Sequence, residues 1–509
     1  MNVLLKRVVQ RVILLVSSFI LQIGVISFFL LKYSESFFDF YLASLTLSII
    51  IVFIIINNKS NPSYKIAWIV PVMIFPIFGG LFYLLYGGNK LSTREKLKMV
   101  IQNIEMTNSL KQDDEIIKKI GDKSIYAKNQ SEYILNYAKC PVYNNTETTY
   151  FKIGEEKFEA LLRELKKAEK FIFLEYFIIQ EGKMFNSILE ILEEKAKQGV
   201  DVRLIYDDVG CIVTLPHNYK NTLEAKGIKC RVFNPIKPFF TRRLNNRDHR
   251  KIVVIDGDVG FTGGINLADE YINEYEKHGY WKDAGIMLKG DAVWNLTVMF
   301  LSMWDYIDNK EEDYIKFKPS KNKYYNSKGY VQPFDDSPLI NEPIGETVYL
   351  NLINKAKDYI YINTPYLIID NEMATALKIA AKSGVDIKIV TPYIPDKKFV
   401  HAVTKSYYES FIKDGIEIYE FTPGFMHAKT FVVDAEYGVV GSINLDFRSL
   451  YLHYECGVWL YKTESIKSMK DDYLETLKRC HKVTMEECKN TSGIRKVLRL
   501  IIRMFAPLL

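Results

Sequence analysis

The chain has 509 residues, of which 48% are hydrophobic and 25% charged, and its formal net charge is +6. This length suits two fused domains together with a membrane region. A charge so close to zero gives no support for a nucleic-acid-binding protein, whereas a mild basic excess suits work at an anionic lipid surface.

Three apolar segments fill most of the first 90 residues. They are residues 12–31, 40–56 and 66–86. The first has 20 uncharged positions, enough to cross a bilayer, and the third is interrupted by Pro71 and Pro76. We therefore expect residues 1–90 to form a membrane region with two to three hydrophobic segments.

The orientation of this region stays open. Basic residues precede the first segment and follow the third, and the positive-inside tendency would place both clusters in the cytoplasm. Three full crossings forbid that placement. Either one segment lies in the membrane interface or re-enters the membrane, or one basic cluster lies outside the cytoplasm. The basic residues are Lys6, Arg7, Arg11, Lys90, Arg94, Lys96 and Lys98.

Beyond a polar, helix-like connector at 91–148, the chain shows strand–helix–strand order. In the first half, 149–308, FIFLEYFII and VDVRLIYDDVG flank the helical MFNSILEILEEKAKQG. In the second half, 339–485, YIYINTPYLI and VDIKIVTPY flank NEMATALKIAAKSG. Residues 309–338 are polar and suit a surface linker. The order predicts an α/β fold with a parallel sheet in each half.

A longer segment is also written twice. HRKIVVIDGDVGFTGGIN begins at His249, and HAKTFVVDAEYGVVGSIN begins at His427. Lysine follows each histidine two positions later, so on an extended strand His249 projects with Lys251, and His427 with Lys429. Because the strand–helix–strand pattern precedes the repeated segment in both halves, a duplicated fold is the best account.

Four further residues match between the copies. Asp256 and Asp434 lie seven positions after their histidines, an odd offset at a strand end, so we expect them to face away and to be structural. Asn266 and Asn444 follow small residues that let backbone and amide approach a ligand, and we expect both to bind phosphate.

Each half also carries an acidic residue at a matching place. KDAGIML contains Asp283, and YECGVWL contains Glu455. A carboxylate at this place is suited to holding an imidazole in one tautomer and to stabilising its cation.

The repeated residues suit attack on a phosphodiester. Two histidines supply a nucleophile and an acid, and lysine with asparagine stabilises charge on the phosphoryl oxygens. We therefore expect no metal and no cofactor. The five histidines outside the motifs are expected to be surface or packing residues rather than a metal cluster. They are His217, His278, His401, His453 and His481.

These segments resemble the paired HKD motifs of the phospholipase D superfamily, and the surrounding chain resembles its bacterial cardiolipin synthase branch. The resemblance implies two similar α/β sandwich halves that form one active site behind N-terminal transmembrane helices. By motif, it makes six residues catalytic, including the two aspartates. They are His249, Lys251, Asp256, His427, Lys429 and Asp434.

The resemblance further implies that two phosphatidylglycerols become cardiolipin and glycerol through a phosphatidyl-histidine, with His249 as nucleophile. It places the protein in the bacterial cell membrane as a multi-pass protein whose catalytic part is cytoplasmic. Whether the chain forms a homo-oligomer stays open. Membrane lipids are the expected partners and nucleic acid is not. The alternatives are a membrane phospholipase D that releases phosphatidic acid, a nuclease of the superfamily, and a non-catalytic scaffold.

Two other segments suit a membrane surface. At 486–509 the chain ends in a basic amphipathic helix, with Arg495, Arg499 and Arg503 on one stripe. Before the first motif, NPIKPFFTRR mixes aromatic and basic residues. This loop either anchors in the core or touches lipid headgroups.

Overall fold

The computed structural model describes residues 37–87, 93–235, 245–308, 310, 312–319, 323–325, 327–340 and 342–508, with six scattered positions between 20 and 32. Most of the first apolar segment and of the NPIKPFFTRR loop lies outside the described residues. The chain divides into two units. The larger comprises Ser92–Pro235 and Asn245–Arg499, and the smaller holds the N-terminal helices and the last ten residues.

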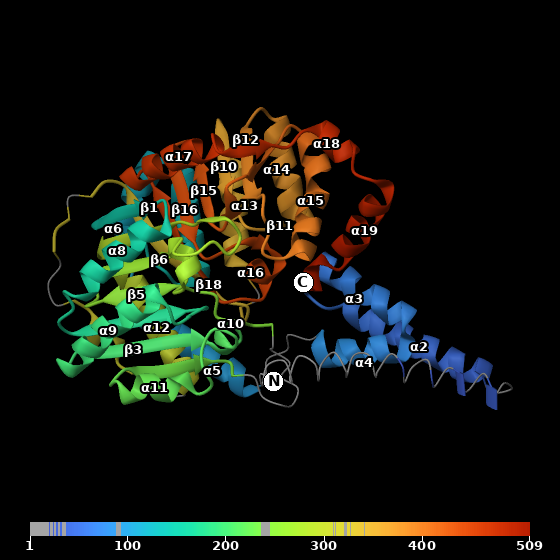
Figure 1. Cartoon of the computed structure of the whole chain (residues 1–509), viewed down its shortest axis with the longest axis horizontal. Helices are drawn as coiled ribbons and strands as arrows, with labels where there is room; N and C mark the ends of the chain where they lie inside the picture. The colour runs from blue at the N-terminus through green and yellow to red at the C-terminus, as the bar shows by residue number, and fades with distance from the viewer. Residues whose placement is uncertain are drawn as a thin grey trace. The chain divides into compact units, whose positions relative to one another are not determined.

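The larger unit contains two mixed sheets (Figure 1). In the described part of the chain, the first sheet has the strand order β1-β8-β6-β5-β2-β3-β4. Its strands are β1 (Thr146–Phe151), β2 (Phe171–Tyr176), β3 (Asp201–Asp207), β4 (Lys229–Phe233), β5 (Ile252–Ile255), β6 (Val259–Gly263) and β8 (Gly285–Gly290).

The second sheet has the order β19-β13-β12-β10-β15-β16-β18-β9. From β9 onward this order matches the first sheet strand for strand, with β19 added, so the fold is duplicated. Its strands are β9 (Tyr330–Asp336), β10 (Tyr359–Asn363), β12 (Asp386–Pro392), β13 (Glu417–Phe421), β15 (Thr430–Val433), β16 (Tyr437–Gly441), β18 (Glu455–Tyr461) and β19 (Cys480–Lys482).

The expectation of parallel sheets holds for only part of each half. The runs β2-β3-β4 and β10-β12-β13 are parallel, and the other ladders of both sheets are antiparallel. The reason is local. Strand β5 is joined to β6, and β15 to β16, by three-residue turns, and so short a connection allows only an antiparallel pair.

Helices and short strands complete the two halves. The first half has α8 (Gly154–Leu165), α9 (Lys183–Lys197), α10 (Asp208–Cys211), α11 (Tyr219–Ala225), η2 (Asp269–Ile272) and β7 (Tyr280–Lys282). The second half has α13 (Ile344–Lys355), β11 (Leu367–Ile368), α14 (Asn371–Lys382), α15 (Lys398–Lys413), β14 (Gly424–Met426), β17 (Leu445–Asp446), α16 (Phe447–Tyr451) and α17 (Glu464–Leu477).

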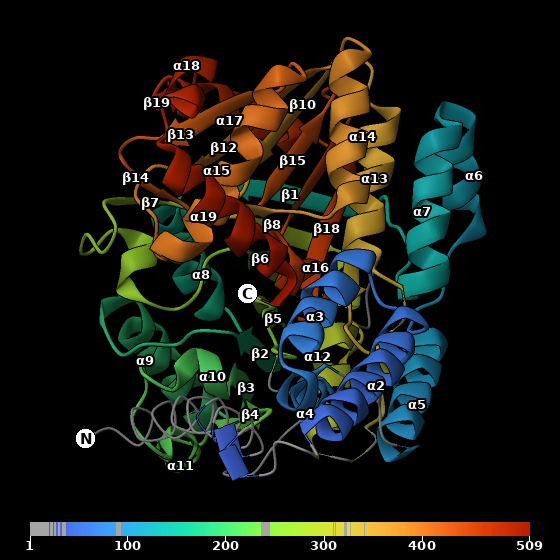
Figure 2. The same ribbon diagram turned by 90° about the vertical axis from the view of Figure 1, so that its right-hand side faces the viewer.

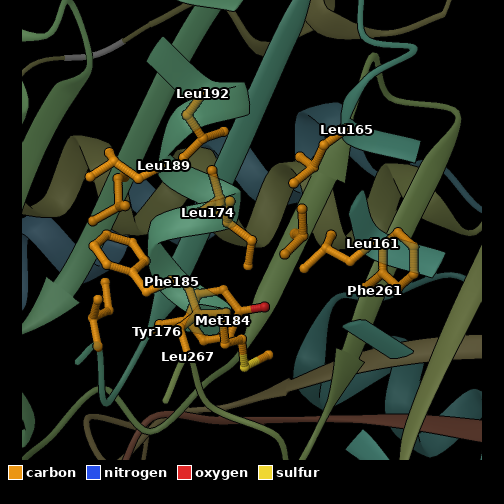
Figure 3. Packing of buried hydrophobic residues seen from close by; sticks show 14 of the residues in the cluster. Leu161, Leu165, Leu174, Tyr176, Met184, Phe185, Leu189, Leu192, Phe261 and Leu267 are labelled. Carbon is orange, nitrogen blue, oxygen red and sulfur yellow. The ribbon is translucent and has the colours of Figure 1, made fainter. Parts of the chain in front are cut away.

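The core of the first half lies between the sheet and helices α8 and α9. Leu161 and Leu165 of α8 face the sheet, and Phe185 and Leu192 of α9 pack near Leu174 of β2 (Figure 3). All five side chains are fully buried. Strand β2 is buried at every position, which explains its continuous apolar and aromatic run.

Helix α12 (Val293–Asp308) joins the two sheets. Every residue from Val293 to Asp305 is buried. The helix contacts β2, β4, β5, β6 and β8 of the first sheet and β9 of the second. The halves also meet directly, because β16 contacts β6 and β8.

The segments expected to be a connector and a linker are parts of the larger unit. The connector forms α5 (Thr93–Ser109), α6 (Asp114–Lys123) and α7 (Ile125–Ala138). Helix α5 packs on α12, and α7 packs on α13 at the edge of the second half (Figure 2). The linker contains η3 (Tyr314–Phe317) and all of β9, which pairs with β18 along its whole length.

The smaller unit contains α2 (Phe37–Ile56), α3 (Pro62–Ile74) and α4 (Pro76–Tyr86), and each of these helices contacts the other two. Within the described residues, α2 is the single helix long and apolar enough to cross a membrane. Helices α3 and α4 have 13 and 11 residues. At about 1.5 Å per residue, both are shorter than a hydrocarbon core of about 30 Å.

The expected third crossing, 66–86, is therefore two short helices. The break falls at Phe75, because a residue before proline avoids helical backbone angles. Gly79 lets the helices approach closely, since a Cβ there would lie 2.5 Å from the Pro71 carbonyl oxygen.

The chain ends in α18 (Met485–Lys489), α19 (Gly493–Met504) and η4 (Ala506–Leu508). The expected amphipathic helix is α19, and no residue of it is buried. Its apolar face is open, with Ile494 77% exposed and Ile501 51% exposed. In contrast, Ala506 of η4 is buried, and η4 contacts α3 within the smaller unit.

Candidate active site

Each motif histidine precedes a central strand of its own sheet, and its backbone is tied to the opposite half. His249 precedes β5, and its N–H donates to the Tyr454 carbonyl oxygen at 2.9 Å. His427 precedes β15, and its N–H donates to the Lys282 carbonyl oxygen at 2.7 Å. Strands β7 and β14, which come from different halves, pair in parallel beside this contact. The two motifs are thus held around an approximate twofold axis.

The acidic residues reach across the same boundary. Nδ1 of His249 lies 2.8 and 3.0 Å from the two carboxylate oxygens of Glu455. Nδ1 of His427 lies 2.5 Å from Oδ2 of Asp283. Both carboxylates are fully buried, and both histidines are 7% exposed. With Nδ1–H donating to a carboxylate, each ring keeps Nε2 for a substrate.

The carboxylates are ionised and the imidazoles neutral. Burial alone would raise the pKa of Glu455, but the charge and hydrogen bond of His249 outweigh it and hold the pKa far below its usual value. The pKa of Asp283 is lowered likewise, against its burial, by His427 and Lys429. Burial lowers the pKa of His249 to about 3 and that of His427 to about 4.

Lys251 and Lys429 are buried beside these pairs. The Lys251 ammonium donates to the His249 carbonyl oxygen at 2.5 Å, and Lys429 donates to that of His427. Burial lowers the pKa of Lys251 to about 8 and that of Lys429 to about 7, although Glu455 and Asp283, respectively, raise them. The charge of Lys251 also lowers the pKa of Lys429, so the two ammonium groups are close enough to repel each other.

The two asparagines differ. Asn266 accepts from the Ile178 N–H at 3.0 Å and donates to the Tyr271 hydroxyl at 2.7 Å. In the described part of the chain, Oδ1 of Asn444 has no hydrogen-bond partner although the residue is 5% exposed. Both sit at the ends of the repeated segments, and their binding of phosphate stays a prediction.

Asp256 and Asp434 are turned away from the histidines. Asp256 accepts the N–H groups of Glu169, Lys170 and Phe171, each at 2.8 Å. Asp434 makes three matching bonds, to the two residues before β10 and to its first residue. Both have left-handed backbone angles, with φ of 52° and 53°. Each carboxylate therefore ties the turn after its motif strand to the start of the neighbouring strand.

Aromatic rings enclose the two imidazoles. Phe177 lies edge-on to His249 with 5.0 Å between ring centroids. Tyr271 and Trp281 lie 5.5 and 5.2 Å from His427. None of these three residues was expected at the site from the sequence, because each reaches its histidine only through the fold.

His453 lies next to the site, a position that sequence reasoning did not assign to it. It was expected to be a surface or packing residue, but its ring centroid lies 5.5 Å from that of His249. Its Nδ1 lies 3.8 Å from Oε1 of Glu455. A signal was available, because residues two apart on an extended segment share a face, and His453 stands two before Glu455.

Charged pairs fasten the halves together around the site. Nη1 of Arg250, next to the first motif histidine, lies 3.2 Å from Oδ1 of Asp335 in β9. Nζ of Lys282 lies 2.6 Å from Oδ1 of Asp472 in α17. All four are buried or nearly so. The position of each histidine against its carboxylate thus depends on both halves.

Among the described residues, one group brings together three donor atoms suited to a metal ion. It comprises His249, His453 and Glu455, whose donor atoms lie within 4.8 Å of one another. The Glu455 carboxylate already accepts the His249 Nδ1–H, which gives the group a role without an ion.

The site combines paired imidazoles with Nε2 free of the carboxylates, two ammonium groups and two amides. This set fits phosphodiester transfer, in which an imidazole attacks phosphorus and cations stabilise the phosphoryl oxygens. Duplicated sheets that meet at paired H-x-K motifs define the phospholipase D class of enzyme.

Comparisons with known proteins agree. A family model described as cardiolipin synthase, PLD-like domain, matches residues 161–294 and 349–477, and one described as phospholipase D-nuclease N-terminal matches 46–88. The structure of phosphatidylserine synthase from Haemophilus influenzae Rd KW20 covers 75% of this chain and all of its own, with a TM-score of 0.55 and 14% identity. It shares the fold.

Curated relatives span most of the chain. An uncharacterized protein of Streptococcus mutans is 45% identical over 459 residues, which cover 90% of this chain and 99% of that protein. The cardiolipin synthase of Alkalihalophilus pseudofirmus is 34% identical over 475 residues, or 91% and 93% of the two chains. That of Geobacillus sp. is 34% identical over 465 residues, or 91% and 92%.

The chain therefore belongs to the cardiolipin synthase family of phospholipase D-like proteins. It is an enzyme of the phosphatidyltransferase class.

Proposed function

We propose that this enzyme transfers a phosphatidyl group from one phosphatidylglycerol to another, giving cardiolipin and glycerol, through a phosphatidyl-histidine. The named relatives support the overall reaction. The observation that carries the mechanism is the cross-pairing of His249 with Glu455 and of His427 with Asp283. The two imidazole–carboxylate pairs lie close enough that the charge of Lys251 in the first half lowers the pKa of His427 in the second, which suits one double-displacement site.

In the first half-reaction, Nε2 of His249 attacks the phosphorus of the donor lipid. A P–N bond forms, the P–O bond to the headgroup breaks, and His427 gives its proton to the departing glycerol oxygen. Lys251 and Lys429 stabilise the charge on the non-bridging oxygens, with the amides of Asn266 and Asn444 beside them. Glu455 stabilises the cationic ring of the phosphatidyl-histidine.

In the second half-reaction, His427 takes the proton from a hydroxyl of the second phosphatidylglycerol. That oxygen forms a new bond to phosphorus as the P–N bond breaks. Cardiolipin leaves, His249 is neutral again, and His427 holds the proton for the next cycle.

The charges of the site support these roles. Burial leaves His249 neutral in the free enzyme, as a nucleophile must be. The pKa of His427 is low for the same reason. A phosphodiester anion raises the pKa of a neighbouring imidazole, so the substrate itself promotes protonation of His427. The buried lysines gain charge in the same way.

We place the enzyme in the bacterial cell membrane, with its catalytic part cytoplasmic. Helix α2 is long enough for one crossing, and residues 12–31 are apolar over a sufficient length for another. The short helices α3 and α4 suit a hairpin that re-enters and leaves by the same face. Two full crossings then put both N-terminal basic clusters on one side, as the positive-inside tendency requires.

The second candidate is a membrane phospholipase D, in which water resolves the phosphatidyl-histidine and phosphatidic acid is released. It uses the same catalytic residues, so only the product separates the two. The test is mass-resolved lipid extraction from cells that lack cardiolipin and express either the wild type or His249→Ala. Cardiolipin with the wild type alone supports the proposal. Phosphatidic acid without cardiolipin contradicts it.

A further inference from the structure

The two halves of the site differ at one matched position. Trp281 stands two residues before Asp283 and lies against His427, with ring centroids 5.2 Å apart. His453 stands two residues before Glu455 and lies against His249, at 5.5 Å. An apolar indole in one half is thus replaced by an imidazole in the other.

The His453 imidazole is buried without a hydrogen-bond partner for either ring nitrogen among the described residues, although it lies within ion-pair distance of Glu455. The residue is 9% exposed. Nδ1 faces Glu455 at 3.8 Å, beyond hydrogen-bond distance, which directs the Nε2 edge away from that carboxylate. A buried polar group without a partner costs free energy, so this ring is suited to a ligand.

A second difference places a cation nearby. Arg448 lies four residues after Asn444, on α16, whereas the first half has Glu270 four residues after Asn266. The carbonyl oxygen of Arg448 accepts the His453 N–H at 2.8 Å, and its guanidinium charge acts on the His453 imidazole. Each replacement exchanges an apolar or acidic side chain for a hydrogen-bond donor, and the charge of Arg448 acts on His453.

We propose that His453 and Arg448 form a second anion subsite beside His249, which binds the phosphodiester of the acceptor lipid. This inference rests on the proposed function. Joining two phosphatidylglycerols requires that two phosphodiesters be held at once. The H-x-K residues occur in both halves and serve the reacting phosphorus, whereas the acceptor's phosphate does not react. An imidazole and a guanidinium present in one half alone match a second anion that enters from one side.

Binding at this subsite should take up a proton. Burial lowers the pKa of His453, Arg448 lowers it further, and Glu455 and Asp446 raise it in part. His249, which faces the ring, is neutral. A phosphodiester placed against the imidazole raises its pKa, so lower pH favours the charged ring and a lower KM for the anionic acceptor.

The experiment offers the enzyme two acceptors at once. Phosphatidylglycerol with a radiolabelled headgroup is incubated in mixed micelles with ethanol, and labelled glycerol release reports the donor step. Cardiolipin and phosphatidylethanol report the anionic and the neutral acceptor. In His453→Trp, which copies the first half, and in Arg448→Gln, the cardiolipin-to-phosphatidylethanol ratio should fall about tenfold, as for loss of one charge-assisted hydrogen bond.

His401→Gln is the matched control, because His401 is a largely buried histidine on α15 beside Glu420. Its ratio should equal that of the wild type. If both products fall in parallel in folded His453→Trp and Arg448→Gln, the residues act through His249 and the inference is overturned. A ratio unchanged in both variants also overturns it. A wild type that makes no cardiolipin would instead refute the proposed function.

Discussion

The motif aspartates are expected to hold the fold together rather than to react, and Asp434→Asn tests this. The Asp434 carboxylate accepts the N–H groups of Lys357, Asp358 and Tyr359 at 2.8, 2.9 and 2.9 Å. Asparagine keeps the size of the side chain and tolerates the φ of 53°. However, it has one oxygen, so its NH2 group would face a backbone N–H.

The magnitude follows from these three bonds. A hydrogen bond to a charged group contributes about 1.5–3 kcal/mol. Asp434→Asn loses one such bond outright and weakens two, so the free energy of unfolding should fall by about 2–4 kcal/mol. Thermal unfolding in detergent should show a midpoint lower by several degrees. Turnover of the folded fraction should stay near that of the wild type.

Glu455→Gln is the matched comparison. It is also isosteric and buried, but it removes the charge that faces the His249 ring. Turnover should fall by about 10² or more while the unfolding midpoint moves little. Equal loss of stability in the two variants would refute the distinction. So would an Asp434→Asn protein with a normal midpoint and no turnover.

Three further outcomes are expected. Lys251→Met and Lys429→Met should each slow cardiolipin formation by about 10² or more in initial-rate assays, and a loss below tenfold would argue against charge stabilisation. Activity should survive exhaustive EDTA treatment, whereas loss restored by one particular divalent ion would contradict the assignment. Burial puts the pKa of Lys251 at about 8 and that of Lys429 at about 7, so kcat/KM should fall as pH rises through this range. A value that keeps rising would count against charged lysines in the free enzyme.

Much of the fold was predictable because the chain repeats itself. Matched spacing of His249 with Lys251 and of His427 with Lys429 indicated two equivalent halves, and the sheets have the same strand order. Sheet direction was harder to predict. A strand–helix–strand pattern reveals the three parallel strands of each half, but the hairpins on the other side depend on short turns.

The motifs single out the histidines, lysines and carboxylates that the structure brings together, but not the way in which they pair. Sequence spacing identifies Asp283 and Glu455 as equivalent, yet each reaches the histidine of the opposite half. That exchange follows from how the halves dock, which no local pattern encodes. The docking also brings His453 to His249 and Trp281 to His427.

In the membrane region, hydropathy did not predict where the helices begin and end. Hydropathy treats 66–86 as one apolar segment, but Pro76 ends the helix at the residue before it, and Gly79 lets the two pieces pack closely. Composition alone cannot separate a long helix from two short ones.

One shared site is expected to form a covalent lipid intermediate on His249, and trapping that intermediate is the most direct test. In His427→Ala, a phosphatidyl substrate with p-nitrophenol as its leaving group needs no acid, so the adduct should form and persist. It should be acid-labile, as a phosphoramidate is, and peptide mapping should place it on His249. Label on His427 in the reciprocal His249→Ala variant, together with no label on His249 in His427→Ala, would contradict the account.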